Sequence, residues 1–472
     1  MHISLNAQQE IKFTKKTNFY IKGNALVIGN NSISKLHKKS YNDFSKINDL
    51  IEMRYIDVDR KPSTFSSSAA TLEIEHPDFR IKKAVLYWSG VYPYSKGVRK
   101  IEDGTRYYYH NIQDRKGDFT QVKLNTPNTD EYIDIQGHVI FDGFEKKNYK
   151  ACAPYVCSAD VTDLLTNSNN ANGEYTVANV RATEGFVSGG SMAGWCLFVV
   201  YESEYENSKY ITSYDGFATL SKNVVDIQFE DFVTKANGQV NANIMLSAME
   251  GDSKLSKDQC FILNKSTQKF HPLRNKVRSA KNFFNGKITN GNTYMNHRKP
   301  NGANALGFDL LTIPIPKEII ANNQKDLTLR LSSMADRFYF YFTAFKTEIK
   351  ETYHYEKIEK NLLSQGSRSI NELKEEQVVE ILGNRELTIP NAKAGYYIIT
   401  NVFSEKENAI NWIAFMQDKG HEDPYMFRNP ENNWYYVSVY QSEDVYQVYK
   451  NHQNLEKLDY FEEIWVFKIN LN

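Results

Sequence analysis

The segment GGSMAG, residues 189–194, comes closest to a known nucleophile motif. In the G-x-S-x-G nucleophile elbow, a sharp turn between a strand and a helix exposes the serine hydroxyl. Here Ala193 takes the place of the second glycine after Ser191, and the apolar run that follows has the character of a strand. We therefore interpret this segment as a turn before a core strand and not as a hydrolase site.

Acidic residues offer two further candidate sites. Glu250 and Asp252 flank Gly251, and a pair of carboxylates can catalyse glycoside hydrolysis when both face one cleft. A glycine between them is instead typical of a turn. Asp57 and Asp59 alternate on one face of an expected strand, where their oxygens could bind Ca²⁺. The glycine and bidentate glutamate of an EF-hand loop are missing, so a calcium site and a solvated strand edge are both compatible with this pair.

Four cysteines are too few for a disulfide scaffold. Cys152 and Cys157 are close in sequence, and Pro154 between them could turn the chain to close a small disulfide loop; two reduced thiols fit equally well. We expect Cys196 and Cys260 to be buried thiols. The sequence contains no CxxC, HExxH or Cys/His cluster, so it predicts no catalytic residues and no cofactor, with calcium as the one metal candidate.

The bulk composition narrows the class of protein. The 472 residues are enough for about two or three domains. Lys and Arg number 57, as do Asp and Glu, and a protein without basic excess is a poor candidate for binding nucleic acid. No run approaches the roughly 20 apolar residues of a membrane span. Residues 1–7 end like the tail of a signal peptide, so we expect an upstream start and cleavage near Ala7.

Residues 8–350 read as many short strands separated by Asn, Gly, Ser and Asp. Aromatic residues make up 13% of the chain, and such residues favour strands. The spacing of the strands predicts an antiparallel β-sandwich or jelly roll, as one or two sub-domains. The expected strands include residues 81–88, 175–180, 194–201, 210–214, 327–331 and 337–345.

The pattern changes after residue 350. The charged stretch 351–393 predicts a linker with a short helix near residues 371–382. In residues 394–472, strands at 395–403 and 433–440 are each followed by a serine and a helical apolar stripe. Ser404 with Glu407 predicts a capping box, and Ser442 predicts a second N-cap. Gly420 is expected to end the first helix, and a last strand follows at 464–469.

This last module resembles a SPOR domain, the small α+β fold (βαββαβ) that binds peptidoglycan glycans. The resemblance lies in residues 396–409 and 434–443, and it implies that two helices cover one face of a sheet and leave the other face open. Strand alternation assigns side chains to faces. Under the helices we expect Ile398, Thr400, Val402, Tyr435, Val437 and Val439. The ligand-binding open face would carry Tyr397, Ile399, Asn401, Trp434, Tyr436, Ser438 and Tyr440.

Residues 8–350 resemble the head region of large gliding and surface adhesins of Bacteroidota, which are exported by the type IX secretion system. The resemblance is carried by the order of several short segments. They are residues 57–59, 63–68, 84–90, 159–162, 193–202 and 214–217.

Together these patterns predict a non-enzymatic, exported binding protein of the cell envelope. An adhesin-like β head would be tethered by the SPOR-like module to peptidoglycan or to an envelope protein, in the periplasm, at the outer membrane or on the cell surface. One alternative is a structural accessory of the secretion or gliding machinery that binds protein instead of glycan. Another is an enzyme that acts on polysaccharide. The head's own ligand is not predicted.

Overall fold

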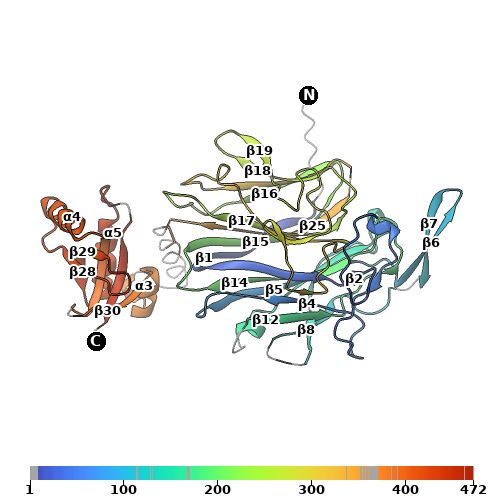
Figure 1. Cartoon of the computed structure of the whole chain (residues 1–472), viewed down its shortest axis with the longest axis horizontal. Coiled ribbons are helices and arrows are strands. Elements are labelled where there is room, and N and C mark those ends of the chain that lie inside the picture. Colours follow the sequence, from blue (N-terminus) through green and yellow to red (C-terminus); the bar gives the residue numbers. More distant parts are fainter. Residues whose placement is uncertain are drawn as a thin grey trace. The chain divides into compact units, whose positions relative to one another are not determined.

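The computed structural model describes residues 9–112, 115–127, 129, 131–166, 171–335, 337–350, 353, 354, 357, 360, 370–383, 385–390, 392–461 and 463–470. The chain divides into two compact units, Met1–Ile349 and Lys350–Asn472, which we call the head and the C-terminal unit. Strands dominate the described residues, so the predicted mostly β fold is confirmed (Figure 1). In this part of the chain, every helix is too short or too polar to cross a membrane.

The head consists of one eleven-stranded sheet, a five-stranded sheet, a four-stranded sheet and two small ones. In spatial order the eleven strands are β10 (His138–Asp142), β11 (Pro154–Asp160), β5 (Arg80–Val91), β14 (Ala193–Glu202), β1 (Gln9–Asn31), β15 (Ser208–Leu220), β25 (Phe338–Glu348), β17 (Ala242–Gly251), β23 (Gly307–Pro314), β20 (Ile288–Asn290) and β21 (Thr293–Tyr294). The five are β22 (Arg298–Lys299), β4 (Ser67–Leu72), β12 (Gly173–Ala178), β8 (Gln121–Asn125) and β9 (Ile133–Gln136). The four are β16 (Asn223–Phe229), β24 (Leu327–Ser333), β18 (Asp258–Asn264) and β19 (Lys269–Pro272).

The head also contains two small sheets and a few short helical segments. Strands β13 (Glu184–Gly185), β6 (Lys96–Glu102) and β7 (Thr105–Ile112) form a three-stranded sheet, and β2 (Ile33–Ser34) pairs with β3 (Arg54–Tyr55). The helical segments are η1 (Asn48–Leu50), η2 (Lys147–Tyr149) and α1 (Thr162–Thr166).

Strand β1 belongs to both halves of the eleven-stranded sheet. Its first part, from Gln9 to Lys22, pairs with β15, and its second part, from Gly23 to Asn31, pairs with β14. The register shifts several times along the first part, as expected where bulges bend a strand. The sheet therefore turns along β1, which allows its two halves to face each other.

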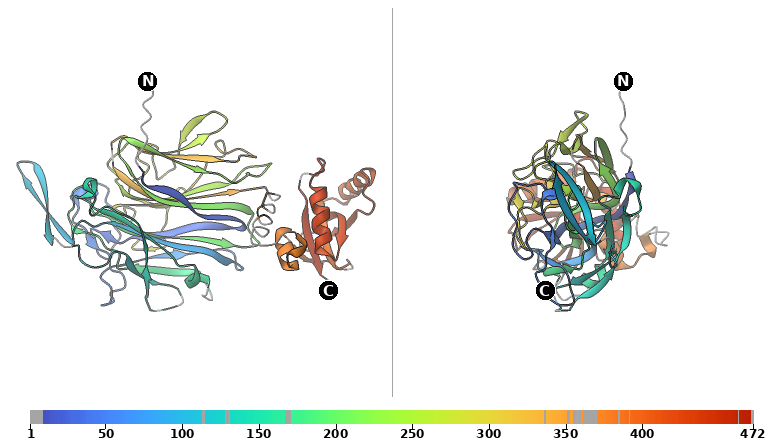
Figure 2. Two further views of the ribbon diagram at one scale, coloured as in Figure 1. Left: turned by 180° about the vertical axis from the view of Figure 1, so that it is seen from behind. Right: turned by 90° about the vertical axis from the view of Figure 1, so that its right-hand side faces the viewer.

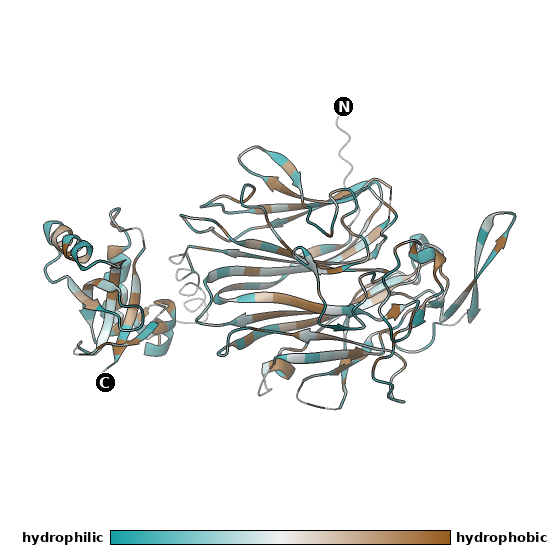
Figure 3. Ribbon diagram, in the orientation of Figure 1, coloured by the Kyte–Doolittle hydropathy of each residue, from teal (hydrophilic) through white to brown (hydrophobic). Residues whose placement is uncertain are grey.

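Aromatic and aliphatic side chains fill the space between these two halves. The ring of Phe342 on β25 lies 4.7 Å from that of Tyr87 on β5 and 5.5 Å from that of Phe198 on β14. The outer face of the β5–β14 half packs against the five-stranded sheet, where the indole of Trp195 donates to Ser68 Oγ over 2.9 Å. The head is thus a stack of sheets (Figure 1) with hydrophobic side chains packed between them. Apolar residues recur along these strands, as the hydropathy colours of Figure 3 show.

The four-stranded sheet covers the outer face of the β15–β25 half of the eleven-stranded sheet. The ring of Phe229 on β16 lies 5.1 Å from that of Phe345 on β25 and 5.4 Å from that of Tyr214 on β15. Because each half of the bent sheet has a partner sheet outside it, the head has four layers, seen from two further directions in Figure 2.

The C-terminal unit is an α+β fold. Its elements are η3 (Ile370–Glu372), α3 (Glu375–Ile381), β26 (Arg385–Thr388), β27 (Gly395–Phe403), α4 (Lys406–Asp418), β28 (Tyr425–Arg428), β29 (Tyr435–Ser442), α5 (Val445–Leu455) and β30 (Trp465–Asn470). The sheet order is β26-β30-β27-β29-β28, with β26 parallel to β30 and the other pairs antiparallel. The elements from β27 to β30 follow the order βαββαβ, a split β-α-β arrangement.

The helices pack on one face of this sheet. Val378, Ala409 and Val448 from α3, α4 and α5 share a core with Ile398 and Val437 from β27 and β29. Side chains of α3, which the sequence assigned to a linker, are therefore part of the packed unit. A short helix in this region agrees with the expected one.

Two predicted helix caps differ from the structure. Helix α4 begins after Glu405, and no side chain caps it, so the predicted capping box of Ser404 and Glu407 is wrong. Helix α5 is capped by Asp444, whose carboxylate accepts from the N–H groups of Tyr446 and Gln447. A carboxylate at this position satisfies free amides and also interacts favourably with the helix dipole. Gly420 adopts φ +89°, as predicted for a residue that ends a helix.

Candidate functional site

The face of the C-terminal sheet opposite the helices is rich in rings, and we call it the aromatic face. Pairing places Tyr425, Ser438, Ile399 and Trp465 side by side in one row across β28, β29, β27 and β30. Side chains directly opposite each other on antiparallel strands point to the same face. The large side chains of the aromatic face are Tyr397, Ile399, Tyr425, Phe427, Tyr436, Trp465 and Phe467.

Five rings of the aromatic face form a continuous network. Phe427 stacks on Tyr436 with centroids 5.7 Å apart, and Tyr436 meets Phe467 edge-on at 5.5 Å. Tyr397 lies 6.0 Å from both Tyr425 and Phe427. These separations lie within the favourable range for aromatic pairs, so each ring holds its neighbours in place.

Part of this face is covered by the chain itself, which corrects the expectation that the whole face is open. Leu387, Ile389 and Ala392, from β26 and the segment that leads to β27, pack against Tyr397 and its neighbours. The hydroxyl of Tyr397 donates to the backbone oxygen of Lys393 over 2.8 Å, and burial raises the pKa of Tyr397. The segment before β27 was read as a linker, so its packing on the sheet was not foreseen.

Exposed rings remain at the β28–β29 side. The side chain of Tyr425 is 43% exposed and that of Trp434 is 48% exposed. Trp465 on β30 is half-buried, and its indole nitrogen is buried without a hydrogen-bond partner among the described residues. The hydroxyl of Tyr436 accepts from Asn432 Nδ2 over 2.9 Å. Tyr425 and Trp434 therefore offer exposed ring faces to a ligand, and tyrosine and tryptophan combine such faces with a polar group.

The β27–β29 pair contains irregularities that moved several predicted side chains. The register shifts on either side of Ile399, so strand alternation fails there. As a result, Tyr440 lies on the helix side, where its hydroxyl donates to Gln447 Oε1 of α5 over 3.4 Å. Val402, predicted under the helices, instead packs against the aromatic face. Both assignments in the sequence analysis are wrong.

Three further residues, Ser438, Asn401 and Thr400, were also assigned to a face of the C-terminal sheet. Ser438 is on the aromatic face but buried, and its hydroxyl donates to the oxygen of Tyr440. Asn401 is half-buried and accepts from the N–H of Val402 through its own Oδ1. Thr400 lies under the helices as expected, and its Oγ1 accepts from the indole of Trp412.

Sequence reasoning missed Tyr425, Phe427 and Phe467. Tyr425 and Phe427 belong to β28, a strand of four residues that was not identified. Their alternation with the intervening residues was the available signal. Phe467 was placed on a strand but not assigned to a face.

In the head, Asp57 and Asp59 bind protein donors. The carboxylate of Asp59 accepts from the hydroxyls of Tyr132 (2.6 Å), Ser67 (2.8 Å) and Thr64 (3.1 Å). Burial acts to raise the pKa of Asp59, but these hydrogen bonds outweigh it and lower the pKa. Within the described ranges, no group of three or more His, Cys, Asp or Glu side chains is arranged to hold a metal ion.

The two neighbouring cysteines are free thiols, so a disulfide between them is contradicted. Cys157 points into the core between β5 and the five-stranded sheet, whereas Cys152 belongs to the core between the two halves of the bent sheet. The thiol of Cys152 lies 3.1 Å from the hydroxyl of Tyr339. Burial raises the pKa of both thiols, which leaves them less reactive.

The other candidate catalytic residues, Ser191, Glu250 and Asp252, are hydrogen-bonded to other residues of the head. The hydroxyl of Ser191 is buried and donates to the oxygen of Thr183 over 2.6 Å. Glu250 accepts from the side chain of Asn48, and Asp252 accepts from the backbone N–H of the same residue. The two carboxylates thus anchor η1 to the end of β17 and its following turn.

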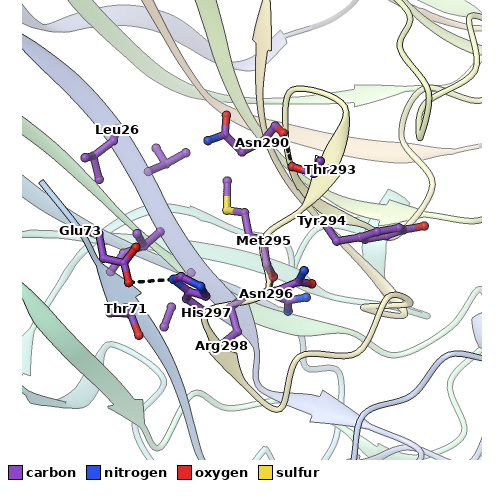
Figure 4. Close-up of a pocket in the computed structure, with 14 residues that line it drawn as sticks. Leu26, Thr71, Glu73, Asn290, Thr293, Tyr294, Met295, Asn296, His297 and Arg298 are labelled. Atoms are coloured by element: carbon purple, nitrogen blue, oxygen red, sulfur yellow. Dashed lines mark hydrogen bonds and ion pairs between the residues drawn. The ribbon is translucent and has the colours of Figure 1, made fainter. Parts of the chain in front are cut away.

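A pocket of about 330 Å³ opens on the head beside β1 and β4 (Figure 4). The carboxylate of Glu73 and Nδ1 of His297 are 2.8 Å apart, and both side chains are mostly exposed. Leu26 and Met295 give the pocket an apolar lining, while Asn290 adds an amide. The volume suits a small ligand.

No family profile matches the sequence, and no curated protein matches it. Among solved structures, "Structure of PNGF-II" is 10% identical with a TM-score of 0.20, and the match covers 70% of this chain and 66% of that one. A BuGH86 variant in complex with neoagarooctaose is 9% identical with a TM-score of 0.18, and the match covers 58% of this chain and 34% of that one. "The Triple Jelly Roll Fold and Turret Assembly in an Archaeal Virus" has a TM-score of 0.14 at 7% identity. Scores this low carry no argument about function.

Proposed function

We propose that this chain is a non-enzymatic, exported binding protein of the cell envelope. In this proposal the head is adhesin-like, and the SPOR-like C-terminal unit tethers it to peptidoglycan in the periplasm or at the outer membrane. The observation that carries the proposal is the exposure of Tyr425 and Trp434, which lie at the two ends of the β28–β29 pair, beside the buried rings. Sugars have apolar faces that can lie on such rings, so a glycan strand that runs along this edge of the sheet would contact both.

The chain's own segment covers the side of the sheet near Tyr397, so the proposed site is smaller than a full open face. A ligand would contact Tyr425, Trp434 and the partly exposed Trp465. The head contributes the pocket beside β1 and β4, which supports a binding role there as well.

A sedimentation assay with purified peptidoglycan tests the tether. The full chain is compared with the double variant Tyr425→Ala, Trp434→Ala, and both side chains are exposed, so the fold should survive. Loss of two contact rings should weaken retention by about tenfold or more, which corresponds to about 1.4 kcal/mol or more.

A matched control is Ile410→Ala. Ile410 is 42% exposed but lies on helix α4, away from the proposed site. Its removal should leave retention unchanged. Equal retention of the wild type and the double variant would refute the site, and an absence of retention for all three would refute the glycan ligand.

The alternative is a structural role in the type IX secretion or gliding machinery, with a protein partner at the same rings. Aromatic side chains are also frequent at the centres of protein interfaces. Co-purification with an outer-membrane complex, lost in the double variant and accompanied by no retention on peptidoglycan, would favour this second function.

A further inference from the structure

Strands β6 and β7 form a hairpin that extends from the layers of the head (Figures 1 and 2). Asp103 and Gly104 make its two-residue turn with φ of 48° and 76°. The base is held by a short parallel bridge to β13 and by Arg99, whose guanidinium lies over the ring of Phe186 at 4.3 Å. Beyond this base, one edge of the hairpin has no pairing strand among the described residues, because β7 is the last strand of its sheet.

Hydrophobic side chains on this hairpin are exposed. Ile101 is 61% exposed, Tyr109 44%, Tyr107 42% and Val98 36%. Val98 is opposite Tyr109, and Tyr107 lies two residues before Tyr109 on β7, so these three share one face of the ribbon. Exposed apolar residues that gather on one face mark contact surfaces more often than scattered ones do.

The free edge of β7 has a definite hydrogen-bonding pattern. A two-residue turn makes its flanking residues, Glu102 and Thr105, a hydrogen-bonded pair. Every second residue of β7 from Thr105 therefore bonds to β6. The residues between them, Arg106, Tyr108 and His110, point their backbone N–H and C=O groups away from β6.

This edge also lacks the usual protection against pairing. Natural edge strands carry lysines, prolines or bulges that prevent another strand from adding. The sequence of β7, TRYYYHNI, contains no lysine, proline or glycine, and its one formal charge is Arg106. Three consecutive tyrosines favour a strand and leave its edge suitable for pairing.

We propose that β7 pairs with β7 of a second copy of this chain, in an antiparallel register centred on Tyr108. A two-fold axis at Tyr108 places Arg106 opposite His110 of the other copy, so all three outward-facing residues of each strand bond to one another. The same register places Tyr107 opposite Tyr109 of the other copy, and aromatic cross-strand pairs stabilise such contacts. Closed two-fold contacts of this kind are the commonest form of homo-oligomer.

The contact is small, so the dimer should be weak. Interfaces below about 1,200 Å² belong to transient complexes, and we expect a Kd on the order of 10–100 µM. Sedimentation velocity of the full chain at rising concentration should show a monomer–dimer equilibrium. A chain that stays monomeric to several hundred micromolar, on the order of ten times the expected Kd, would overturn the proposal.

Two variants at one position test the role of the backbone. Arg106→Pro removes an outward N–H at an edge position that tolerates proline, and it should weaken dimerisation at least tenfold. Arg106→Ala removes the same side chain, including its approach to Asp49 at 3.6 Å, but keeps the N–H, so it should still dimerise. Equal dimerisation of the two variants would contradict pairing through this edge.

A crosslinking experiment tests the register. In a hydrogen-bonded antiparallel pair the opposed Cα atoms are about 5.5 Å apart, within the range for a disulfide. Tyr108→Cys should therefore crosslink two copies under mild oxidation. Tyr107→Cys should not, because the two copies of residue 107 lie on a diagonal of about 7–8 Å. The four native cysteines are buried and give no background. Crosslinking of Tyr107→Cys alone would exclude the proposed register.

Discussion

Replacing Asp309 with Asn should destabilise the head by about 3–5 kcal/mol, the usual cost of removing one partner of a buried ion pair. Asp309 and Arg278 are both fully buried, and the carboxylate accepts from Arg278 Nη1 over 2.7 Å. It also accepts from the backbone N–H groups of Asn285, Gly286 and Lys287 over 3.0–3.2 Å. In Asp309→Asn the guanidinium loses its counter-charge, and an amide N–H₂ replaces one acceptor among these donors.

The assay is urea denaturation of the full chain, followed by far-ultraviolet circular dichroism, with the free energy of unfolding taken from the midpoint and slope of the head transition. The matched control is Asp226→Asn. Asp226 forms a bidentate pair with Arg330 at 2.6–2.7 Å, but the side chain of Arg330 is 32% exposed and that of Asp226 is 41% exposed. Exposed pairs contribute about 0.2–1 kcal/mol.

A double-mutant cycle completes the test. Arg278→Met with Asp309→Asn should cost less than the sum of the two single changes, because each single change leaves an unpaired buried group. If Asp309→Asn and Asp226→Asn lower stability equally, or if the cycle is additive, the buried pair is not a coupled unit and the reasoning is wrong.

Two further predictions concern single side chains of the head. Burial lowers the pKa of Lys346 from its usual 10.5 to about 8, so between these values the unfolded chain binds more protons and stability should rise with pH. The rise should total about 3 kcal/mol and should flatten in Lys346→Met, measured by denaturation at pH 8, 9 and 10 relative to the wild type. Because Cys152 and Cys157 are free buried thiols, a reducing agent should not change the denaturation midpoint. A thiol reagent should label the native chain slowly and the unfolded chain completely, and a midpoint that falls on reduction would contradict this.

The sequence predicted the architecture where periodicity was strong. Alternating apolar residues and frequent turns identified the mostly β head, and the two strand–helix repeats identified the α+β unit. It could not predict that β1 turns between two halves of one sheet, because such a turn depends on bulges that local pattern does not reveal. Nor could it predict four layers, since both faces of a doubly covered sheet are simply apolar.

The candidate site was predicted only in part. Strand alternation placed Tyr397 and Tyr436 correctly on the face opposite the helices, but the irregular pairing around Ile399 moved Tyr440 to the other side. Which side chains of the aromatic face are buried was harder to predict than which side chains belong to it. Leu387 and Ile389 cover part of this face, but they lie in a charged stretch whose pattern did not indicate packing on the sheet. Short strands such as β28 fall below the length at which alternation is reliable.

The shared position of β1 has a consequence for how the chain acquires its structure. The strands that pair with β1 come much later in the chain, β14 about 160–180 residues further along and β15 about 190–210. At about 5–20 residues per second, the ribosome delivers them on the order of 10–40 s after β1. During that interval β1 has no pairing strand in either half, so the sheet cannot close on either side of it. Nascent chains of this protein should therefore remain susceptible to proteases, and dependent on chaperones, until the residues of β15 have emerged.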